Sequence, residues 1–161
     1  MTARVLNGAA AGAVAATLWA LQQPFDQRAF GSRYDDVELL GRLVARGPAW
    51  RPAGLAMHAA NGAAFGGAYA IARPHLPGTP VAQGVTAAMV ENFAFWPLGR
   101  LIDRYHPARR ALEPLAGNRR ALAQATWRHL LFGFVLGLLE SRLNRVPVRS
   151  AQLPPSTGRH A

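Results

Sequence analysis

Four ionisable side chains interrupt stretches of sequence that otherwise carry no charge: His58, Glu91, Arg128 and His129. A glutamate carboxylate and an arginine guanidinium form a strong ion pair, and an imidazole takes up or releases a proton near neutral pH. Two histidines can also supply the axial ligands of a haem. These residue types therefore fit an ion pair that holds helices together, a proton pathway or a haem site.

The same four residues fall within apolar segments that are long enough to cross a membrane. Each segment has roughly the 17 to 25 residues that a helix needs to span the hydrocarbon layer. Glu91 interrupts the third segment and Arg128 the fourth. We therefore predict an all-α, four-helix transmembrane bundle forming one domain over residues 1–145, with helices at about 5–25, 52–72, 79–99 and 121–140.

The composition favours a membrane protein over a soluble one. Of the 161 residues, 50% are hydrophobic and 16% are charged, whereas soluble domains have about 25% charged residues. The net charge of +10 comes from 18 basic residues, all arginine, which lie between the apolar segments rather than along one stripe. We therefore expect no nucleic-acid partner. The absence of cysteine excludes disulfides and thiolate metal sites.

Two other interpretations of the apolar segments compete with this one. The first is a soluble alanine-rich bundle, but the segments lack the polar stripe, repeated every 3.6 residues, of a helix that faces water. The second is a cleaved signal peptide, because the chain begins with a basic residue followed by an apolar stretch. The sequence "TLWA" lacks the small-residue pattern of a cleavage site.

Pairs of glycines four residues apart occur in three of the four segments. Small residues at this spacing let two helix backbones approach closely in lipid. In the second and fourth segments a histidine precedes the pair by four residues, which gives the pattern H-x3-G-x3-G twice. The repeat predicts two tandem helical hairpins related by an axis along the membrane normal. The six predicted packing glycines are Gly8, Gly12, Gly62, Gly66, Gly133 and Gly137.

Polar residues at similar depth predict a single polar layer towards one end of the bundle. Glu91 lies eight residues before the end of its segment and Arg128 seven residues after the start of its own. At 1.5 Å per residue, both lie roughly 10 to 12 Å from the same end. We predict a Glu91–Arg128 ion pair, which serves either a function or only the register of the helices. The layer comprises His58, Asn61, Glu91, Asn92, Arg128 and His129, with Thr17 close to it.

Two long polar connections join the predicted helices. The first contains a predicted amphipathic helix at about 33–46, which lies either on the membrane surface or, solvated, over the end of the bundle. Asp35, Asp36 and Glu38 are expected to face solvent and to form no metal site. The second is rich in arginine and broken by two prolines, which favours contact with anionic lipid headgroups. Eleven arginines lie on the side of these connections and six on the other, so the connections are expected to face the cytoplasm. The proline-punctuated tail at 146–161 is predicted to be disordered.

Three functions are compatible with this pattern. The first, which we favour, is a structural or binding component of the membrane, with membrane lipid or another protein as partner. The second is transport of a small solute or of protons, for which the chain would form a homo-oligomer. The third is a b-type haem protein with His58 and His129 as ligands. We predict no catalytic residues, metal or bound cofactor, because the sequence has no HExxH, GxSxG or P-loop pattern.

The stretches "ENFAFWPLGRLIDRYHPAR" and "NRRALAQATWRHLLFGFVLGLLE" resemble small uncharacterised polytopic proteins of bacterial inner membranes, of the YagU type. The resemblance covers mainly residues 84–145. It implies a multi-pass protein of the bacterial inner (plasma) membrane. It implies no activity and assigns no functional residue.

Overall fold

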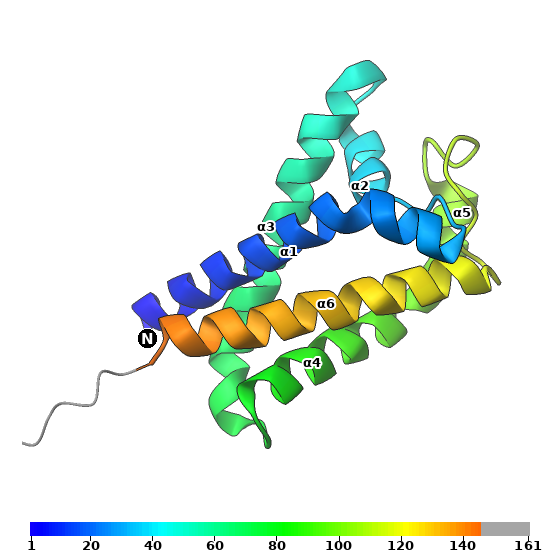
Figure 1. Cartoon of the computed structure of the whole chain (residues 1–161). Coiled ribbons are helices and arrows are strands. Elements are labelled where there is room, and N and C mark those ends of the chain that lie inside the picture. The colour runs from blue at the N-terminus through cyan, green and yellow to red at the C-terminus, as the bar shows by residue number, and fades with distance from the viewer. Residues whose placement is uncertain (146–161) are drawn as a thin grey trace, which may run out of the picture.

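The computed structural model describes residues 1–145, which form helices and no strands (Figure 1). This confirms the predicted all-α class. The predicted disorder of the tail concerns residues 146–161, which lie outside the described residues. The α-helices are α1 (Thr2–Phe30), α2 (Asp36–Val44), α3 (Trp50–Ala72), α4 (Pro80–Phe95), α5 (Gly99–Tyr105) and α6 (Arg119–Leu143), with the 3-10 helices η1 (Gly47–Ala49), η2 (Arg73–His75) and η3 (Trp96–Leu98) between them.

The first helix, α1, extends five residues beyond its predicted end at residue 25. Pro24 lies inside the helix instead of ending it. A proline removes one backbone hydrogen bond and bends a helix, and α1 changes direction in its C-terminal part (Figure 1). The helix ends at Gly31, whose left-handed backbone (φ 60°) lets its N–H donate to the Gln27 carbonyl. The extension places Asp26 on the inner face of α1.

The third predicted segment, at 79–99, is not one continuous α-helix. α4 ends at Phe95, and Pro97 lies in the tighter turn of η3 before α5 begins at Gly99. The 16 residues of α4 reach about 24 Å, less than the ~30 Å core of a bilayer. Among the described residues, α1 and α6 are the two helices long and apolar enough to cross a membrane. The prediction of four membrane-spanning helices is therefore not confirmed.

The long helices pack as antiparallel pairs. α1 runs antiparallel to both α3 and α6, α4 runs antiparallel to α6, and α3 crosses behind α1 and α6 in Figure 1. The start of α1 lies beside the end of α6, where the Asn7 amide donates to the Leu143 carbonyl over 3.1 Å. α2 folds back along the first half of α3. The pairs α1 with α3 and α4 with α6 correspond to the hairpins that the sequence repeat predicts.

The predicted packing glycines lie where helix backbones touch. A Cβ atom on Gly12 would lie 2.0 Å from the Gly62 carbonyl oxygen, which is far inside van der Waals contact. The glycines therefore set the distance between the helices, as predicted. All six predicted glycines make such contacts, and the structure adds Gly84 opposite Gly133, Pro80 opposite Gly137, and Gly41 and Gly54 where α2 crosses α3.

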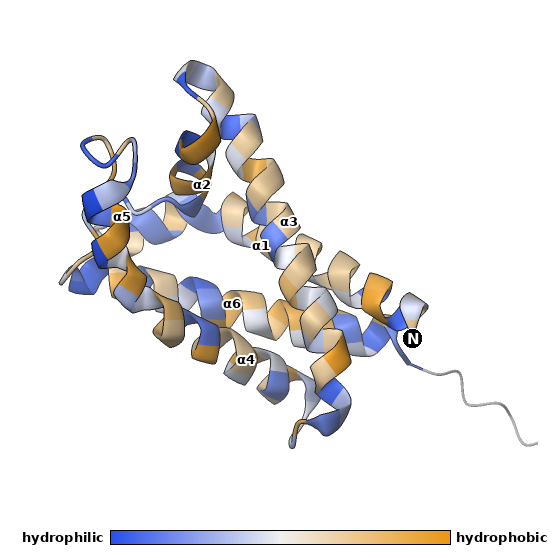
Figure 2. Cartoon of the chain, turned by 180° about the vertical axis from the view of Figure 1, so that it is seen from behind, coloured by the Kyte–Doolittle hydropathy of each residue, from blue (hydrophilic) through white to orange (hydrophobic). Residues whose placement is uncertain are grey.

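Many large apolar side chains lie on the outside of the bundle, whereas the interior holds alanines, polar side chains and a few large apolar ones such as Trp19, Phe132 and Leu136. Leu21 is 67% exposed and Phe134 is 50% exposed, whereas the largest fully buried side chains include Arg128, Gln124 and Glu140. Most of the buried apolar residues are alanines. Figure 2 shows hydrophobic residues along the long helices and strongly hydrophilic ones in the loop after α5. Soluble proteins have the opposite distribution, with large apolar side chains inside.

Candidate binding pocket beside a buried ion network

Arg128 is fully buried and joins three helices through ion pairs. Its Nε and Nη2 atoms donate to the two carboxylate oxygens of Asp26 on α1, over 2.6 and 2.7 Å. Its Nη1 atom donates to Asp36 at the start of α2, over 2.8 Å. Paired bonds from one guanidinium to one carboxylate are a strong and geometrically specific form of ion pair. The network therefore ties α1, α2 and α6 together.

The predicted Glu91–Arg128 ion pair is wrong. Glu91 instead contacts His129, the next residue along α6, with 2.6 Å between its Oε2 atom and the His129 Nε2 atom. Consecutive residues of an α-helix point about 100° apart, so Arg128 faces α1 while His129 faces Glu91 on α4. Equal depth along two helices is therefore not sufficient for contact, because the two side chains must also lie on facing sides of their helices.

Asp36 accepts hydrogen bonds from Trp19 on α1, over 3.0 Å, and from the hydroxyl of Tyr34. Burial disfavours its charged form, but the Arg128 guanidinium and the Tyr34 hydrogen bond outweigh burial and hold the pKa of Asp36 below its usual value. Burial and the Asp36 carboxylate raise the pKa of Tyr34 well above its usual value. The expectation that Asp36 faces solvent is wrong, because Asp35 caps α2 and the next side chain turns inward.

Asp26 is 2% exposed and its oxygens are surrounded by donors besides Arg128. The Gln124 amide donates to Oδ1 over 2.6 Å, and the Gln22 amide donates to Oδ2. Sequence reasoning missed Asp26, which follows directly after the first uncharged run. The available signal was helical spacing, since Trp19, Gln22 and Asp26 recur at intervals of three and four on one face of α1.

The hydrogen bonds of the Glu91–His129 pair indicate where its protons lie. The His129 Nδ1 atom lies 2.7 Å from the Ala125 carbonyl oxygen, which only accepts, so Nδ1 donates. The Nε2 atom then either donates to Glu91 as part of an imidazolium or accepts from a protonated carboxyl group. In both cases the pair holds one proton between its members. The Glu91 side chain is 37% exposed, so this proton can be reached from outside the bundle.

A cavity of about 290 Å³ lies beside the ion network and the Glu91–His129 pair. Residues from all of α1 to α6 line it, so only the assembled fold forms it. Five residues of the predicted polar layer line the cavity: His58, Asn61, Glu91, Asn92 and His129. Arg128 contacts Asp36, which is part of the wall. Six aromatic side chains complete the wall: Trp19, Tyr34, Phe65, Phe95, Trp96 and Phe132.

The polar residues of the cavity wall differ in whether their polar atoms have hydrogen-bond partners. The Asn92 amide donates to the Thr126 hydroxyl over 3.2 Å. The buried Nε2 atom of His58 has no hydrogen-bond partner among residues 1–145. Thr17, expected near the layer, is exposed and bonds back to the Ala13 carbonyl of its own helix. The wall therefore presents an unsatisfied imidazole nitrogen as well as the Glu91 carboxylate.

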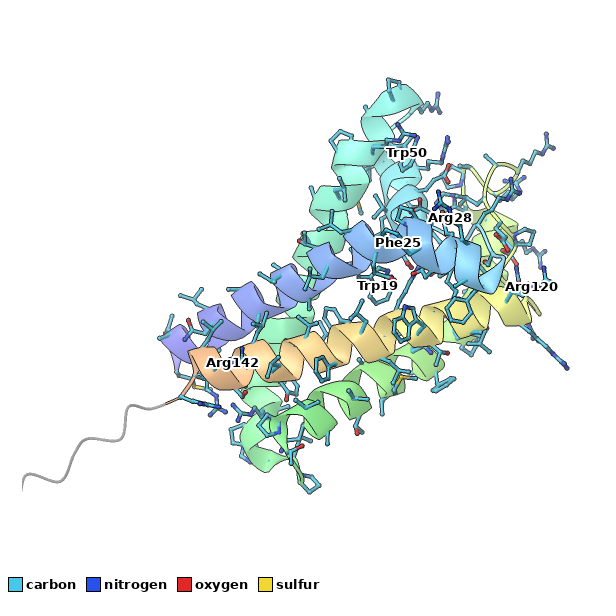
Figure 3. All side chains as sticks on the ribbon, viewed as in Figure 1. Trp19, Phe25, Arg28, Trp50, Arg120 and Arg142 are labelled. Carbon is cyan, nitrogen blue, oxygen red and sulfur yellow. The ribbon has the colours of Figure 1, made fainter. Side chains whose placement is uncertain are left out.

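Trp19 separates the two histidines that the haem interpretation requires. Its ring centroid lies 5.2 Å from that of His58 and 4.7 Å from that of His129, with the rings edge to face. Figure 3 shows Trp19 projecting from α1 towards α6. Both ring nitrogens of His129 also have partners already. A haem between the histidines would displace the indole, so this arrangement does not favour a haem site.

A second buried ion cluster lies at the opposite end of the bundle. Glu140 is fully buried and pairs with Arg73 over 2.5 Å and with Arg4 over 3.8 Å. The Asn144 amide donates to the same carboxylate over 2.9 Å. These contacts join the start of α1, the end of α3 and the end of α6. Sequence reasoning did not identify this cluster, because Glu140 is the last residue of the predicted helix at 121–140 and its partners lie far away in the sequence.

No protein-family model, curated protein or solved structure matches this chain. The resemblance to YagU-type proteins therefore stays a prediction.

Proposed function

We propose that the chain is a multi-pass membrane protein with four spanning helices. The two helices that meet the length and hydropathy requirements, together with the apolar exterior and polar interior, support membrane insertion. α3 has 23 residues and so reaches about 34 Å, and it carries no charge between residues 52 and 72. α4 continues into η3, whose residues Trp96–Leu98 carry no charge and lengthen the fourth apolar path.

The distribution of charge supports an orientation with the α2 and α5 end in the cytoplasm of a bacterial cell. Arg28 and Arg120 lie at that end and Arg142 at the other (Figure 3). At the other end, Arg4 and Arg73 share the single carboxylate of Glu140. Eleven arginines lie on the side of the two long connections and six on the other, so the positive-inside rule assigns the α2 and α5 end to the cytoplasm.

We propose that the role of the protein is binding, with the central cavity as its site. The observation that carries this proposal is the convergence of five predicted polar residues and six aromatic side chains on one cavity. Such a combination of apolar wall and few polar groups is typical of small-ligand sites. The Arg128 network already fixes the helices. His58 and Glu91 retain hydrogen-bonding capacity that packing does not use among the described residues.

Native mass spectrometry of protein extracted in mild detergent tests the binding role. We expect a non-covalent adduct on the wild-type protein, and its loss when Asn61→Trp fills the cavity. Leu55→Trp is the matched control, because Leu55 is 50% exposed on the same helix and does not line the cavity. An adduct that survives Asn61→Trp, or a wild-type protein without any adduct, would contradict the proposal.

Transport by an oligomer is the second candidate function. The Glu91–His129 pair favours it, because a proton held between two partly exposed side chains beside a cavity can be exchanged. Proteoliposomes loaded with a pH indicator distinguish the two roles. Proton flux that is abolished by Glu91→Gln would favour transport. No proton flux, together with a ligand adduct on the purified protein, would favour binding alone.

A further inference from the structure

We propose that the cavity binds an organic cation, an ammonium group carried on a small apolar body. This inference rests on the proposed binding function and names the class of ligand for the same site. Three independent features of the wall support it: its charge, its aromatic side chains and the unsatisfied nitrogen of His58.

The polar layer carries more negative than positive charge. Asp26 and Asp36 share the one guanidinium of Arg128, and Glu91 adds a third carboxylate, which contacts His129 instead. The proton on the Glu91–His129 pair compensates one of the two excess negative charges. Asp36 and Glu91 line the cavity, and no arginine is among the described residues that line it. Excess negative charge away from water is costly, so a cation in the cavity is favoured over a neutral or anionic ligand.

The aromatic side chains suit a cation with an apolar body. Six aromatic rings line a cavity of about 290 Å³, and ring faces attract cations electrostatically. The ion network already contains one such contact, since the Arg128 guanidinium carbon lies 5.5 Å from the Tyr34 ring centroid. The apolar part of the wall, which includes Leu39 and Leu98, offers contact to the remainder of the ligand.

His58 supplies a matching acceptor. It is 9% exposed, lines the cavity, and its Nε2 atom has no partner among residues 1–145. An ammonium group donates up to three hydrogen bonds. The Glu91 Oε1 atom has no hydrogen bond from the described residues, so it can accept one from the ammonium group while Oε2 keeps its contact with His129. The counter-ion is Asp36, which lines the cavity and shares the Arg128 guanidinium with Asp26. The ligand would therefore bridge Glu91 on α4 and His58 on α3.

Isothermal titration of the full-length protein in detergent tests this inference with three probes of similar shape: 2-phenylethylammonium, 2-phenylethanol and 3-phenylpropanoate. We expect the ammonium probe to bind at least about tenfold more tightly than the other two, equivalent to about 1.4 kcal/mol. Asp36→Asn should remove this preference, because it removes the carboxylate of the wall that no second positive charge compensates. Glu38→Gln is the matched control, because Glu38 lies outside the central cavity and pairs with Arg42 on the surface.

The source of the ammonium group is assigned by competition. Displacement of the probe by lysophosphatidylethanolamine, but not by lysophosphatidylglycerol, would place the group on a lipid headgroup. Failure of both to displace it would indicate a free amine. Displacement by both lipids alike would overturn selectivity for a cation.

The remaining outcomes separate this inference from the proposed function. Equal binding of the three probes, or an unchanged preference in Asp36→Asn, with binding lost in Asn61→Trp, would overturn the cation inference and leave a binding site for apolar molecules. No binding of any probe, together with no adduct on the purified protein, would overturn both.

Discussion

Replacing Asp26 with asparagine tests the buried ion network most sharply. The change keeps the shape of the side chain and removes its charge. In place of one carboxylate oxygen, an amide NH₂ group would face the Arg128 guanidinium, so two donors would meet. Asp36 would be left as the single counter-ion of Arg128 among the described residues.

The expected loss of stability follows from the two bonds at 2.6 and 2.7 Å that Asp26 accepts from Arg128. Hydrogen bonds to charged groups contribute about 1.5 to 3 kcal/mol each. The asparagine oxygen retains one of the two bonds, so we expect a loss of about 2 to 4 kcal/mol. For a chain of this size 1 kcal/mol corresponds to about 2 to 4 °C, which gives a decrease in melting temperature of about 4 to 16 °C.

Thermal unfolding in detergent, followed by tryptophan fluorescence, measures this decrease. Two carboxylate variants serve as comparisons. Glu38→Gln removes a partly exposed i,i+4 pair with Arg42, and such pairs contribute about 0.3 to 0.5 kcal/mol. Glu91→Gln keeps a hydrogen bond to His129 at a partly exposed position and should also have a small effect. A larger decrease for Glu91→Gln than for Asp26→Asn would refute the network and favour the Glu91–Arg128 pair.

Three further predictions concern packing, pH and orientation. Gly12→Ala should destabilise the protein by about 1 to 3 kcal/mol, because its Cβ atom would meet the Gly62 carbonyl oxygen. Gly67→Ala should not, because the nearest atom would lie 3.5 Å from its Cβ atom. Equal melting temperatures of the two variants would contradict this. The lowered pKa of Asp36 means that its stabilisation is complete above the unfolded pKa of about 3.9 and is lost as pH falls through the folded pKa. Acid should therefore destabilise the wild type more than Asp36→Asn, and parallel melting curves against pH would argue against it. A reporter active only in the periplasm should be active when fused after Ala161, and activity of a cytoplasmic reporter there would reverse the orientation.

The sequence alone was sufficient for properties that depend on periodicity. The glycine pairs predict the helix crossings, and apolar length predicts the position of each long helix to within a few residues in most cases. The exceptions lie at prolines. Pro24 bends α1 without ending it, and contacts with α3 and α6 hold this helix in place. Pro97 follows the end of α4. Local sequence does not distinguish these outcomes, because tertiary packing decides between them.

The residues of the candidate site were predictable, but their partners were not. Five of the six predicted polar residues line one cavity because they lie at a similar depth along neighbouring helices. Pairing also depends on the rotation of each helix and on the path of the connections. Asp36 reaches Arg128 only because the chain after α1 turns back into the bundle, and no spacing in the sequence encodes this return.

The central claim is that the apolar outer faces of the helices lie in lipid around a polar interior. Because the chain has no cysteine, single cysteines can be introduced at Val14, which is 47% exposed, at Phe134, which is 50% exposed, and at the exposed loop residue Arg33. Labelling with a charged maleimide in open membrane fragments reports which thiols meet water. We expect rapid labelling at position 33, and labelling at positions 14 and 134 only after detergent is added. Equal labelling of all three in intact lipid would contradict it.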